Sequence, residues 1–384
     1  MALIGNAAHF VEIKTFHSYC FDLLGRIGNL DEAKDVVSRA AQMINEGEVE
    51  PNRIAKTVLV IDEAQDMSFE EFALVKALMN NNENMRVIAV GDDDQNIFEF
   101  RGSDSKYMFN LLEEEGGRLI EMTENYRSSR SVISYANSFV NKISNRKKTT
   151  NIIPVRDFNG SVEMTLHKSE YIYQPIVEHL LHNRVNGTTA ILTQTNEEAT
   201  IIIALLRKHG INGKLIQSMD GFAFMNLAEV RYFLKHLCEG EQTPRISQNI
   251  WDKAKELTFN AYAKSDCLVY LKRCVEQFES VNRDKYYSDF REFIYESTLE
   301  DFCDITDGDV IVSTIHKAKG KEFDNVYMLL AKNFNKDNSL LRRYYVGMTR
   351  AKNSLFIHTN EDIRERRRCM LWYIESKQCD CTCW

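Results

Sequence analysis

The stretch VLVIDEAQD (residues 58–66) indicates which class of fold this chain adopts. A run of apolar residues that ends in Asp62 and Glu63 is typical of a buried parallel strand whose C-terminal tip presents two carboxylates. Phosphate-transfer proteins use such carboxylates to hold the Mg²⁺ of a bound nucleotide. Taken alone, the stretch is more often an acidic helix N-cap after a buried strand, so other motifs must decide between the two interpretations.

A nucleotide site of this kind also needs a loop that wraps the phosphates, and the sequence has no match to one. The pattern G-x-x-x-x-G-K-[ST] supplies backbone N–H groups, a lysine and a hydroxyl that ligates Mg²⁺. The Gly-Lys pairs of the chain, Gly213-Lys214 and Gly320-Lys321, are followed by leucine and glutamate. No glycine stands five positions before either pair.

Composition and charge narrow the class of protein. With 384 residues, 44% hydrophobic content and only 4 prolines, the chain is long enough for two or more folded domains. Its nine cysteines are irregularly spaced, and neither a signal peptide nor a membrane-spanning segment is evident, so a cytoplasmic protein with reduced thiols is expected. The formal net charge of -8 argues against a surface that is basic throughout but permits a local basic groove.

Strand and helix patterns alternate on both sides of the opening stretch, which predicts an α/β fold with parallel, doubly wound sheets. Before residue 130 the expected strands are 11–16, 58–62, 86–90 and 118–123, with helices at 17–28, 31–44, 69–79 and 105–112. A second series has strands at 161–167, 189–193, 213–217, 309–315, 325–330 and 353–358, and a helix at 197–210. Between about residues 226 and 304 the helical period dominates, which predicts a helical insertion.

A second group of chemistry-bearing residues follows the strand at 86–90. The stretch VGDDDQNIFEFRGSD (90–104) places three carboxylates and Gln95 at the strand end, followed by Phe98, Phe100 and Arg101. Gln95 suits contact with a γ-phosphate, and the phenylalanines suit stacking on unpaired bases. Paired phenylalanines are more often core residues, but here they stand among charged residues in a predicted loop.

Several stretches together resemble superfamily-one DNA helicases of the UvrD/Rep/PcrA type. In order, the following resemble the second to sixth signature motifs of that family: DEAQD (62–66), GDDDQNIFEFRGS (91–103), ENYRSS (124–129), STIHKAKGKEF (313–323) and LRRYYVGMTRAK (341–352). Upstream, TFHSYC (15–20) is similar to a shorter DNA-contacting motif. The resemblance extends over roughly residues 10 to 360.

The resemblance implies two RecA-like doubly wound parallel-sheet domains with small helical insertions, the first domain being truncated. The expected first domain is 1–130, with a short insertion at about 21–56. The expected second domain is 131–360, with an insertion at about 229–304. A basic, Cys-containing tail at 361–384 would follow. Its Cys-x-Cys-x-Cys spacing lacks the C-x-x-C pairs of zinc or iron–sulfur sites, which favours an unstructured tail over a metal site.

The family also implies a role for each matching residue around ATP and Mg²⁺. Asp62 would hold Mg²⁺, Glu63 would position the attacking water, and Gln95 would contact the γ-phosphate. Arg127 and Arg350 would act as arginine fingers from opposite sides of a cleft between the two sheet domains. The remaining cofactor-binding residues implied by the resemblance are Tyr126 on adenine, Glu322 on the ribose, and Gly320.

Further residues would contact DNA, with single-stranded DNA or single/double-strand junctions as the expected partner. Phe100 resembles the family's base-stacking aromatic residue, which tolerates any base. The other implied DNA-binding residues are Thr15, Phe16, His17, Thr314 and His316. A lone histidine such as His316 is also commonly a packed core residue, and Lys317 with Lys319 could form a solvated face.

The absent first motif leads to the last expectation from sequence. The phosphate cradle would lie upstream of Met1, on a polypeptide segment that this chain lacks, so the chain alone is expected to be inactive. Two other functions stay open. One is a nucleic-acid-binding scaffold without ATPase activity. The other is the motor part of an ATP-dependent exonuclease of the RecB type, whose nuclease would come from another chain.

Overall fold

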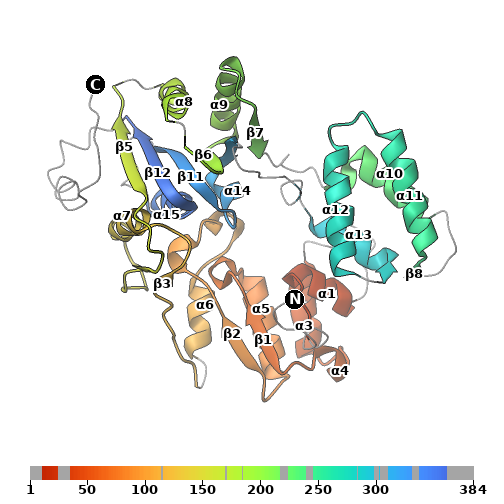
Figure 1. The fold of residues 1–384 in the computed structure, drawn as a ribbon. Helices are drawn as coiled ribbons and strands as arrows, with labels where there is room; N and C mark the ends of the chain where they lie inside the picture. Colours follow the sequence, from red (N-terminus) through yellow and green to blue (C-terminus); the bar gives the residue numbers. More distant parts are fainter. Residues whose placement is uncertain are drawn as a thin grey trace. The chain divides into compact units, whose positions relative to one another are not determined.

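The computed structural model describes residues 11–24, 35–113, 116–168, 171–183, 185–216, 224–238, 245–282, 284–297, 302, 310–330 and 337–360 (Figure 1). They fall into two compact units. Unit one comprises residues 1–125, 136–155 and 334–346, and unit two comprises 126–135, 156–333 and 347–384. Unit one is thus not a single continuous segment, since two later segments return to it. The predicted tail at 361–384 lies outside the described residues.

The sheet of unit one has two parallel strands, β1 (Val58–Ile61) and β2 (Arg86–Ala89), paired from Val58 with Arg86 to Ile61 with Ala89. Successive side chains point to opposite faces of a strand. Leu59 and Ile61 therefore point to one face and pack against apolar residues of the unit, whereas Val58 and Val60 are exposed on the other face. Ile88 and Val90 are exposed as well, so one apolar face of this sheet is open.

Helices cover the other face of that sheet. They are α1 (Phe16–Leu24), α3 (Val36–Asn45), α4 (Pro51–Ile54) and α5 (Phe69–Asn80). α5 begins at a capping box, because Ser68 accepts the N–H of Glu71 while the Glu71 carboxylate accepts the N–H of Ser68. Val37, Ile44 and Leu74 belong to the core beneath these helices.

Short elements complete unit one. After β2 come the 3₁₀ turns η3 (Asp93–Gln95) and η4 (Glu99–Arg101), α6 (Lys106–Asn110), η5 (Leu111–Glu113), and a two-residue parallel pair of β3 (Glu124–Asn125) with β4 (Ile153–Pro154). Another turn, η2 (Ala64–Asp66), follows β1. Two helices, α7 (Arg130–Val140) and α15 (Asn338–Met348), have residues in both units.

Two predicted strands of unit one are wrong. Residues 11–15 form no strand, and α1 begins at Phe16. Residues 118–123 are also outside any strand, and Leu119, Ile120 and Met122 are between 60% and 76% exposed. A strand needs a neighbour for its backbone N–H and C=O groups, and among the described residues neither segment has one.

Unit two contains a six-stranded parallel sheet in the order β5-β12-β11-β6-β10-β7 (Figure 1). The strands are β5 (Ser161–Leu166), β6 (Thr189–Thr193), β7 (Gly213–Ile216), β10 (Val310–Thr314), β11 (Phe323–Leu330) and β12 (Ala351–Thr359). Each matches a predicted strand to within two residues. The α/β class with a doubly wound parallel sheet is therefore confirmed.

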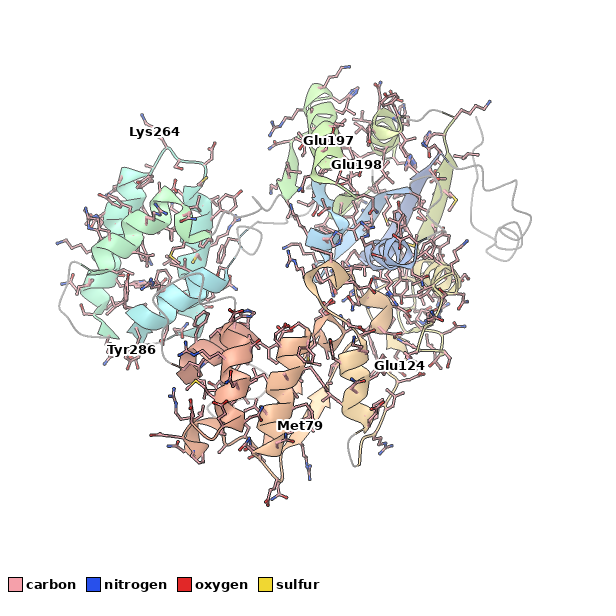
Figure 2. All side chains as sticks on the ribbon, turned by 180° about the vertical axis from the view of Figure 1, so that it is seen from behind. Met79, Glu124, Glu197, Glu198, Lys264 and Tyr286 are labelled. Carbon is pink, nitrogen blue, oxygen red and sulfur yellow. The ribbon has the colours of Figure 1, made fainter. Side chains whose placement is uncertain are left out.

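Helices α8 (Tyr173–His182) and α9 (Asn196–Lys208) cover one face of the six-stranded sheet. Ile176 of α8 and Ile202 of α9 share a core with Ile191, Val312 and other strand residues. α9 begins at a second capping box, between Thr195 and Glu198, and Glu197 lies beside it in the first turn, as Figure 2 shows. Acidic groups there stabilise the N-terminus of the helix.

The predicted helical insertion is confirmed as a separate core within unit two. It contains η6 (Phe224–Asn226), α10 (Ala228–Cys238), α11 (Gln248–Ala261), α12 (Leu268–Val281) and α13 (Tyr287–Glu296), with one antiparallel pair, β8 (Arg245–Ile246) and β9 (Lys285–Tyr286). Trp251 is buried against Phe233, Phe278 and Phe290. Lys264 and Tyr286 mark its surface in Figure 2.

The short helix α14 (Ile315–Ala318) follows β10 directly. None of the helices that the structure describes is both long and apolar enough to cross a membrane.

Candidate nucleotide and nucleic-acid site

The C-terminal ends of β1 and β2 carry the first group of predicted residues. The N–H of Ala64 donates to the carbonyl of Val90, and the N–H of Val90 donates to that of Ile61, each at 2.8 Å. These bonds extend the pairing of the strands into the turn that follows β1. Asp62 is exposed there, and one of its carboxylate oxygens accepts the N–H of Glu63 at 2.9 Å.

Glu63 has a left-handed backbone, with φ 49° and ψ 38°. For a residue with a Cβ this region costs roughly 1–2 kcal/mol, and such outliers cluster at functional sites. The strain is tolerated because the neighbouring backbone is held by the strand-end hydrogen bonds. The exposed Glu63 carboxylate is thereby presented at the end of β1.

Gln65 was not predicted to matter, yet it joins the two strand ends. Its buried side chain donates to the Glu63 carboxylate and accepts the N–H of Asp92 at 3.0 Å. Its backbone carbonyl accepts the side-chain amide of Asn96 at 2.9 Å. A Cβ added to Gly91 would lie 2.5 Å from the Gln65 amide oxygen, so only glycine allows this close approach. The signal available in the sequence was the polar glutamine inside the DEAQD stretch.

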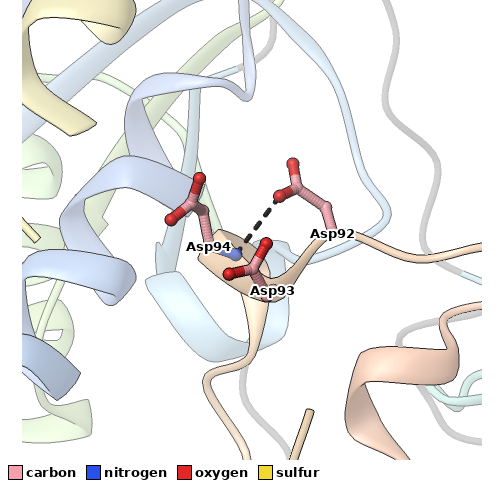
Figure 3. A group of neighbouring side chains, drawn as sticks. All are labelled: Asp92, Asp93 and Asp94. Atoms are coloured by element: carbon pink, nitrogen blue, oxygen red, sulfur yellow. Dashed lines mark hydrogen bonds between the residues drawn. The ribbon is translucent and has the colours of Figure 1, made fainter. Parts of the chain in front are cut away.

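The turn after β2 presents Asp92, Asp93 and Asp94 close together (Figure 3). Asp92 accepts the N–H of Asp94 and the side-chain amide of Gln95. Asp93 accepts the N–H of Lys147 at 2.9 Å. The oxygens of these aspartates are therefore engaged within the protein, and they fit a structural role better than a cation site.

Arg146 is a second residue that sequence analysis missed. Its guanidinium donates to both carboxylate oxygens of Asp94, at 2.7–2.9 Å, and both side chains belong to unit one. Burial raises the pKa of Asp94 to about 6, against the opposing hydrogen bonds from Arg146. The loop after α7 thus anchors the turn that carries Gln95. No local pattern predicts a pair separated by 52 positions.

Phe100 is exposed, which excludes the core interpretation of this residue; 70% of its surface is accessible. The guanidinium of Arg101 lies 5.3 Å from the ring centre of Phe98 and 5.4 Å from that of Phe100. Buried Asn96 anchors the loop, because its side-chain oxygen accepts the N–H of Phe98 and the hydroxyl of Ser103. An exposed ring on an anchored loop is suited to base stacking.

The other predicted DNA contacts of unit one lie at the start of α1. Thr15 is exposed, and its carbonyl accepts the N–H of Tyr19 at 3.0 Å. Phe16 is half-buried and packs against the apolar clusters of the unit, whereas His17 is exposed. Phe16 therefore contributes to the core, and Thr15 and His17 offer accessible polar groups.

In unit two, Arg127, Glu322 and Lys352 form one charged group. The guanidinium of Arg127 pairs with the Glu322 carboxylate, and the Lys352 ammonium lies 3.3 Å from it. Burial would raise the pKa of Glu322, but the hydrogen bond and charge of Arg127 outweigh it, and the pKa lies below its usual value. Glu322 is thus an ionised partner of Arg127 in this structure.

Both predicted arginine fingers belong to unit two, which corrects the expectation that they come from opposite sheet domains. Arg350 is buried directly before β12, and its guanidinium donates to the Thr349 hydroxyl. The N–H of Phe323 donates to its carbonyl at 3.0 Å. Tyr126, in the same unit, is 67% exposed and offers a ring face for stacking.

Thr314, His316 and Gly320 lie where β10 passes into α14. Thr314 is buried and precedes the helix, and His316 is half-buried within it. Lys317 does not form a freely solvated face, because its ammonium donates to the Asn196 side chain at 2.8 Å. Gly320 has φ 79°, so glycine favours the turn that leads to Glu322.

The residues present fit a divalent cation at one position. An exposed carboxylate at the end of a parallel strand, as Asp62 provides, is a usual Mg²⁺ ligand in nucleotide sites. The described residues contain no glycine-rich loop of the phosphate-wrapping kind beside it.

Comparisons with known proteins agree with these features. A model of the UvrD/REP helicase N-terminal domain matches residues 27–115, and a model of the UvrD-like helicase C-terminal domain matches 120–240 and 239–362. An ATP-dependent DNA helicase Rep from Buchnera aphidicola (strain Sg) is 22% identical over 301 residues, covering 73% of this chain and 44% of that protein. ATP-dependent DNA helicase PcrA from Bacillus subtilis is 30% identical over 190 residues, covering 46% of this chain and 24% of PcrA.

The chain thus spans less than half the length of these relatives. A solved C-terminal domain of a possible DNA helicase from Lactobacillus plantarum overlaps 61% of this chain and 87% of that domain, at 17% identity and a TM-score of 0.29, too low to inform on the fold. The C-terminal family model alone covers more than half of the 384 residues. The chain belongs to the UvrD/Rep family of helicases.

Proposed function

We propose that this chain is part of an ATP-dependent motor that moves along single-stranded DNA. The loop between Gln95 and Phe100 is the observation that carries the proposal. Gln95 stands on the turn held by Asp92 and Gln65, and exposed Phe100 stands five residues further on the same loop, which Asn96 anchors. A movement of the turn on loss of a γ-phosphate would therefore be passed to the base-stacking ring.

In unit one, each remaining role follows from exposure and position. Asp62, exposed at the strand end, would hold the Mg²⁺ of MgATP, which would draw negative charge from the phosphates. Glu63, fixed in a strained backbone, would orient or deprotonate the attacking water. Thr15 and His17 would contact the DNA strand.

In unit two, the proposed roles call for positive charge and an exposed aromatic ring. Arg127 and Arg350 would neutralise charge that develops on the transferred phosphoryl group. Tyr126 would stack on adenine, and Glu322 with Gly320 would hold the ribose. The pairing of Arg127 with Glu322 implies that Arg127 must exchange this partner for phosphate when ATP binds. Thr314 and His316 would contact DNA.

We further propose that a polypeptide segment with a β-strand and a phosphate-binding loop completes unit one. A parallel sheet is normally covered on both faces, but Val58, Val60, Ile88 and Val90 are exposed on β1 and β2. The exposed apolar segment 118–123 lacks a strand partner among the described residues. A strand inserted parallel to β2, between β2 and the segment 118–123, would end at the same edge of the sheet as β1 and β2. The loop that follows it would then lie near Asp62 and Gln95.

The ATPase test compares the chain with and without such a segment. The chain alone should show no DNA-stimulated ATP hydrolysis, since positioning of the phosphates supplies most of the catalysis. An N-terminal fusion to a strand followed by G-x-x-x-x-G-K-T should hydrolyse ATP, and Glu63→Gln should abolish that activity. If the unfused chain hydrolyses ATP and Glu63→Gln abolishes this activity, the proposal that the phosphate-binding loop comes from another segment is contradicted. A fused chain that binds DNA without turnover would indicate the scaffold function.

The DNA test uses two exposed phenylalanines of unit one, Phe100 and Phe69. Phe100→Ala should weaken binding of a fluorescent single-stranded oligonucleotide by about 1–3 kcal/mol, the usual contribution of a stacked base. Phe69→Ala, on α5, is the matched control and should leave affinity unchanged. Affinity should also fall with salt. Equal affinities of both variants and the parent chain would reject the proposed DNA path.

A further inference from the structure

Four of the nine histidines of the chain, His167, His179, His182 and His358, gather at the β5 edge of the sheet in unit two. Nε2 of His167 lies 2.8 Å from Nδ1 of His358, and Nε2 of His358 lies 2.9 Å from Nδ1 of His179. The middle ring, on β12, is fully buried, so both of its nitrogens face another imidazole and not water. None of the proposed motor roles uses this group.

The distances fix how protons are arranged along the three rings. A separation of 2.8–2.9 Å between two ring nitrogens accommodates one hydrogen, so each pair must combine one donor with one acceptor. At the outer side of His179, Nε2 faces both the Glu163 carboxylate, at 3.3 Å, and the side-chain amide nitrogen of Asn183. A neutral His358 carries one ring hydrogen, so it donates to one neighbour and accepts from the other, and the three rings share one tautomer.

The surroundings provide little compensation for added positive charge. Among the described residues, the titratable groups that face the three rings are Glu163 from β5, His182 from α8 and Tyr327 from β11. Tyr327 is buried, and within the described part of the chain its hydroxyl has no hydrogen-bond partner. The Glu163 carboxylate can therefore offset the positive charge of one imidazolium. A second charged ring would lie about one hydrogen-bond length from the first, and the two charges would repel each other.

We propose that His167, His358 and His179 form a proton-sensitive latch that holds β5 and α8 against β12 while its rings are neutral and releases this edge on acidification. The latch joins three elements that are distant in the chain, because His167 directly follows β5, His179 lies on α8 and His358 lies on β12. The apolar contacts of the His179 ring with Tyr327 and Phe356 depend on the same placement.

The sign of the effect follows from the pKa shifts. Burial lowers the pKa of all three histidines, most strongly that of His358, where the charges of His179 and His167 lower it further. An unfolded histidine takes up a proton as the pH falls through about 6.5. Below that pH the open state therefore binds more protons than the closed state, and the edge loses stability. Above it both states are neutral and the latch is closed.

Amide hydrogen exchange of the full chain tests the latch at pH 7.5, 6.5 and 5.5, with protection factors corrected for the pH dependence of chemical exchange. Below pH 6.5 the opening constant for β5 and β12 should rise by up to tenfold per pH unit for each histidine that stays neutral in the closed state. His358→Phe retains an aromatic ring but cannot be protonated. It should reduce the rise in the opening constant by up to tenfold per pH unit. His209→Phe, at an exposed histidine after α9, should keep the slope of the parent chain.

Exchange at β5 and β12 that is independent of pH, or an unchanged slope in His358→Phe, would overturn the proposal. Nitrogen NMR of ¹⁵N-histidine in the unsubstituted chain supplies a readout that does not depend on the variant's folding. It should show three neutral rings of one common tautomer at pH 7.5. Two or more imidazolium rings at that pH would also overturn the proposal.

Discussion

The parallel sheets of the two units differ, among the described residues, in how many strands they contain and in how fully their faces are covered. In unit two, β6 and β11 have neighbours on both sides, and their residues are buried on both faces. In unit one, β2 is the one strand that pairs with β1 among the described residues, and alternate residues of both strands are exposed. A short parallel sheet is stabilised mainly by the apolar side chains that pack on its faces. The difference between the two sheets therefore shows how much stability neighbouring strands and covering helices add to a strand.

Local opening should give the largest difference between the sheets. Amides of β1 and β2 should exchange at least about a thousandfold faster than those of β6 and β11, or about 4 kcal/mol in opening free energy. The reason is that one face of β1 and β2 is exposed, and neither strand has a second neighbour among the described residues. Hydrogen exchange with mass spectrometry at pH 7.5 measures both. Equal protection would mean that unit one is closed by itself, and a completing segment would lose its structural support.

Removal of the Arg146 guanidinium should destabilise the smaller sheet next most strongly. Arg146→Ala leaves Asp94 buried without its partner, which typically costs about 3 kcal/mol or more. The cost should grow from pH 6 to pH 8, because the pKa of Asp94, already about 6, rises further and the carboxyl must then lose a proton while unpaired. Urea unfolding of unit one, followed by exchange at β2, measures the effect.

The exposed pair of Arg130 with Asp157 in unit two is the control for that substitution. Arg130→Ala should cost less than about 0.5 kcal/mol, because ion pairs in water contribute little. A cost for Arg146→Ala that is equally small would mean that the aspartate turn does not depend on its buried partner.

Adjacent residues of β1 test the open face directly. Ile61→Ala should cost about 2 kcal/mol or more, since Ile61 packs in the core of unit one. Val60→Ala should cost less than about 0.5 kcal/mol, because 60% of Val60 is exposed. In the fusion that carries a phosphate-binding loop, Val60→Ala should become as costly as a core substitution. Denaturation midpoints of the parent chain, the two variants, the fusion and the fusion with Val60→Ala give the result. A cost for Val60→Ala that the fusion does not change would argue against cover on that face.

The smallest effect concerns the strained residue at the end of β1. Glu63→Gly should stabilise unit one by about 1 kcal/mol, because glycine adopts φ 49° without the Cβ conflict. Glu63→Gln keeps the strain and should leave stability unchanged. Thermal unfolding distinguishes the two variants. A destabilised Glu63→Gly would show that the carboxylate contact with Gln65 outweighs the backbone strain.

The sequence by itself determined the elements whose signals are local. Periodicity and turn residues located the six strands of unit two to within two residues, and the motifs identified the helicase family before any geometry was known. Serine or threonine followed three positions later by glutamate specifies the starts of α5 and α9. The exposure of Phe100 and Tyr126 and the placement of Asp62 and Glu63 at a strand end agree with the proposed roles of those residues.

Tertiary structure decided everything that depends on a distant partner. The apolar segment 118–123 has the composition of a strand, but it forms none, because pairing is a property of two segments and no described segment pairs with it. The structural role of Arg146 depends on its ion pair with Asp94, and that of Arg127 depends on its pair with Glu322, which lies 195 positions away in the chain. The three histidines of the latch come from separate elements, and only the fold brings their nitrogens within hydrogen-bonding distance in a site shielded from water.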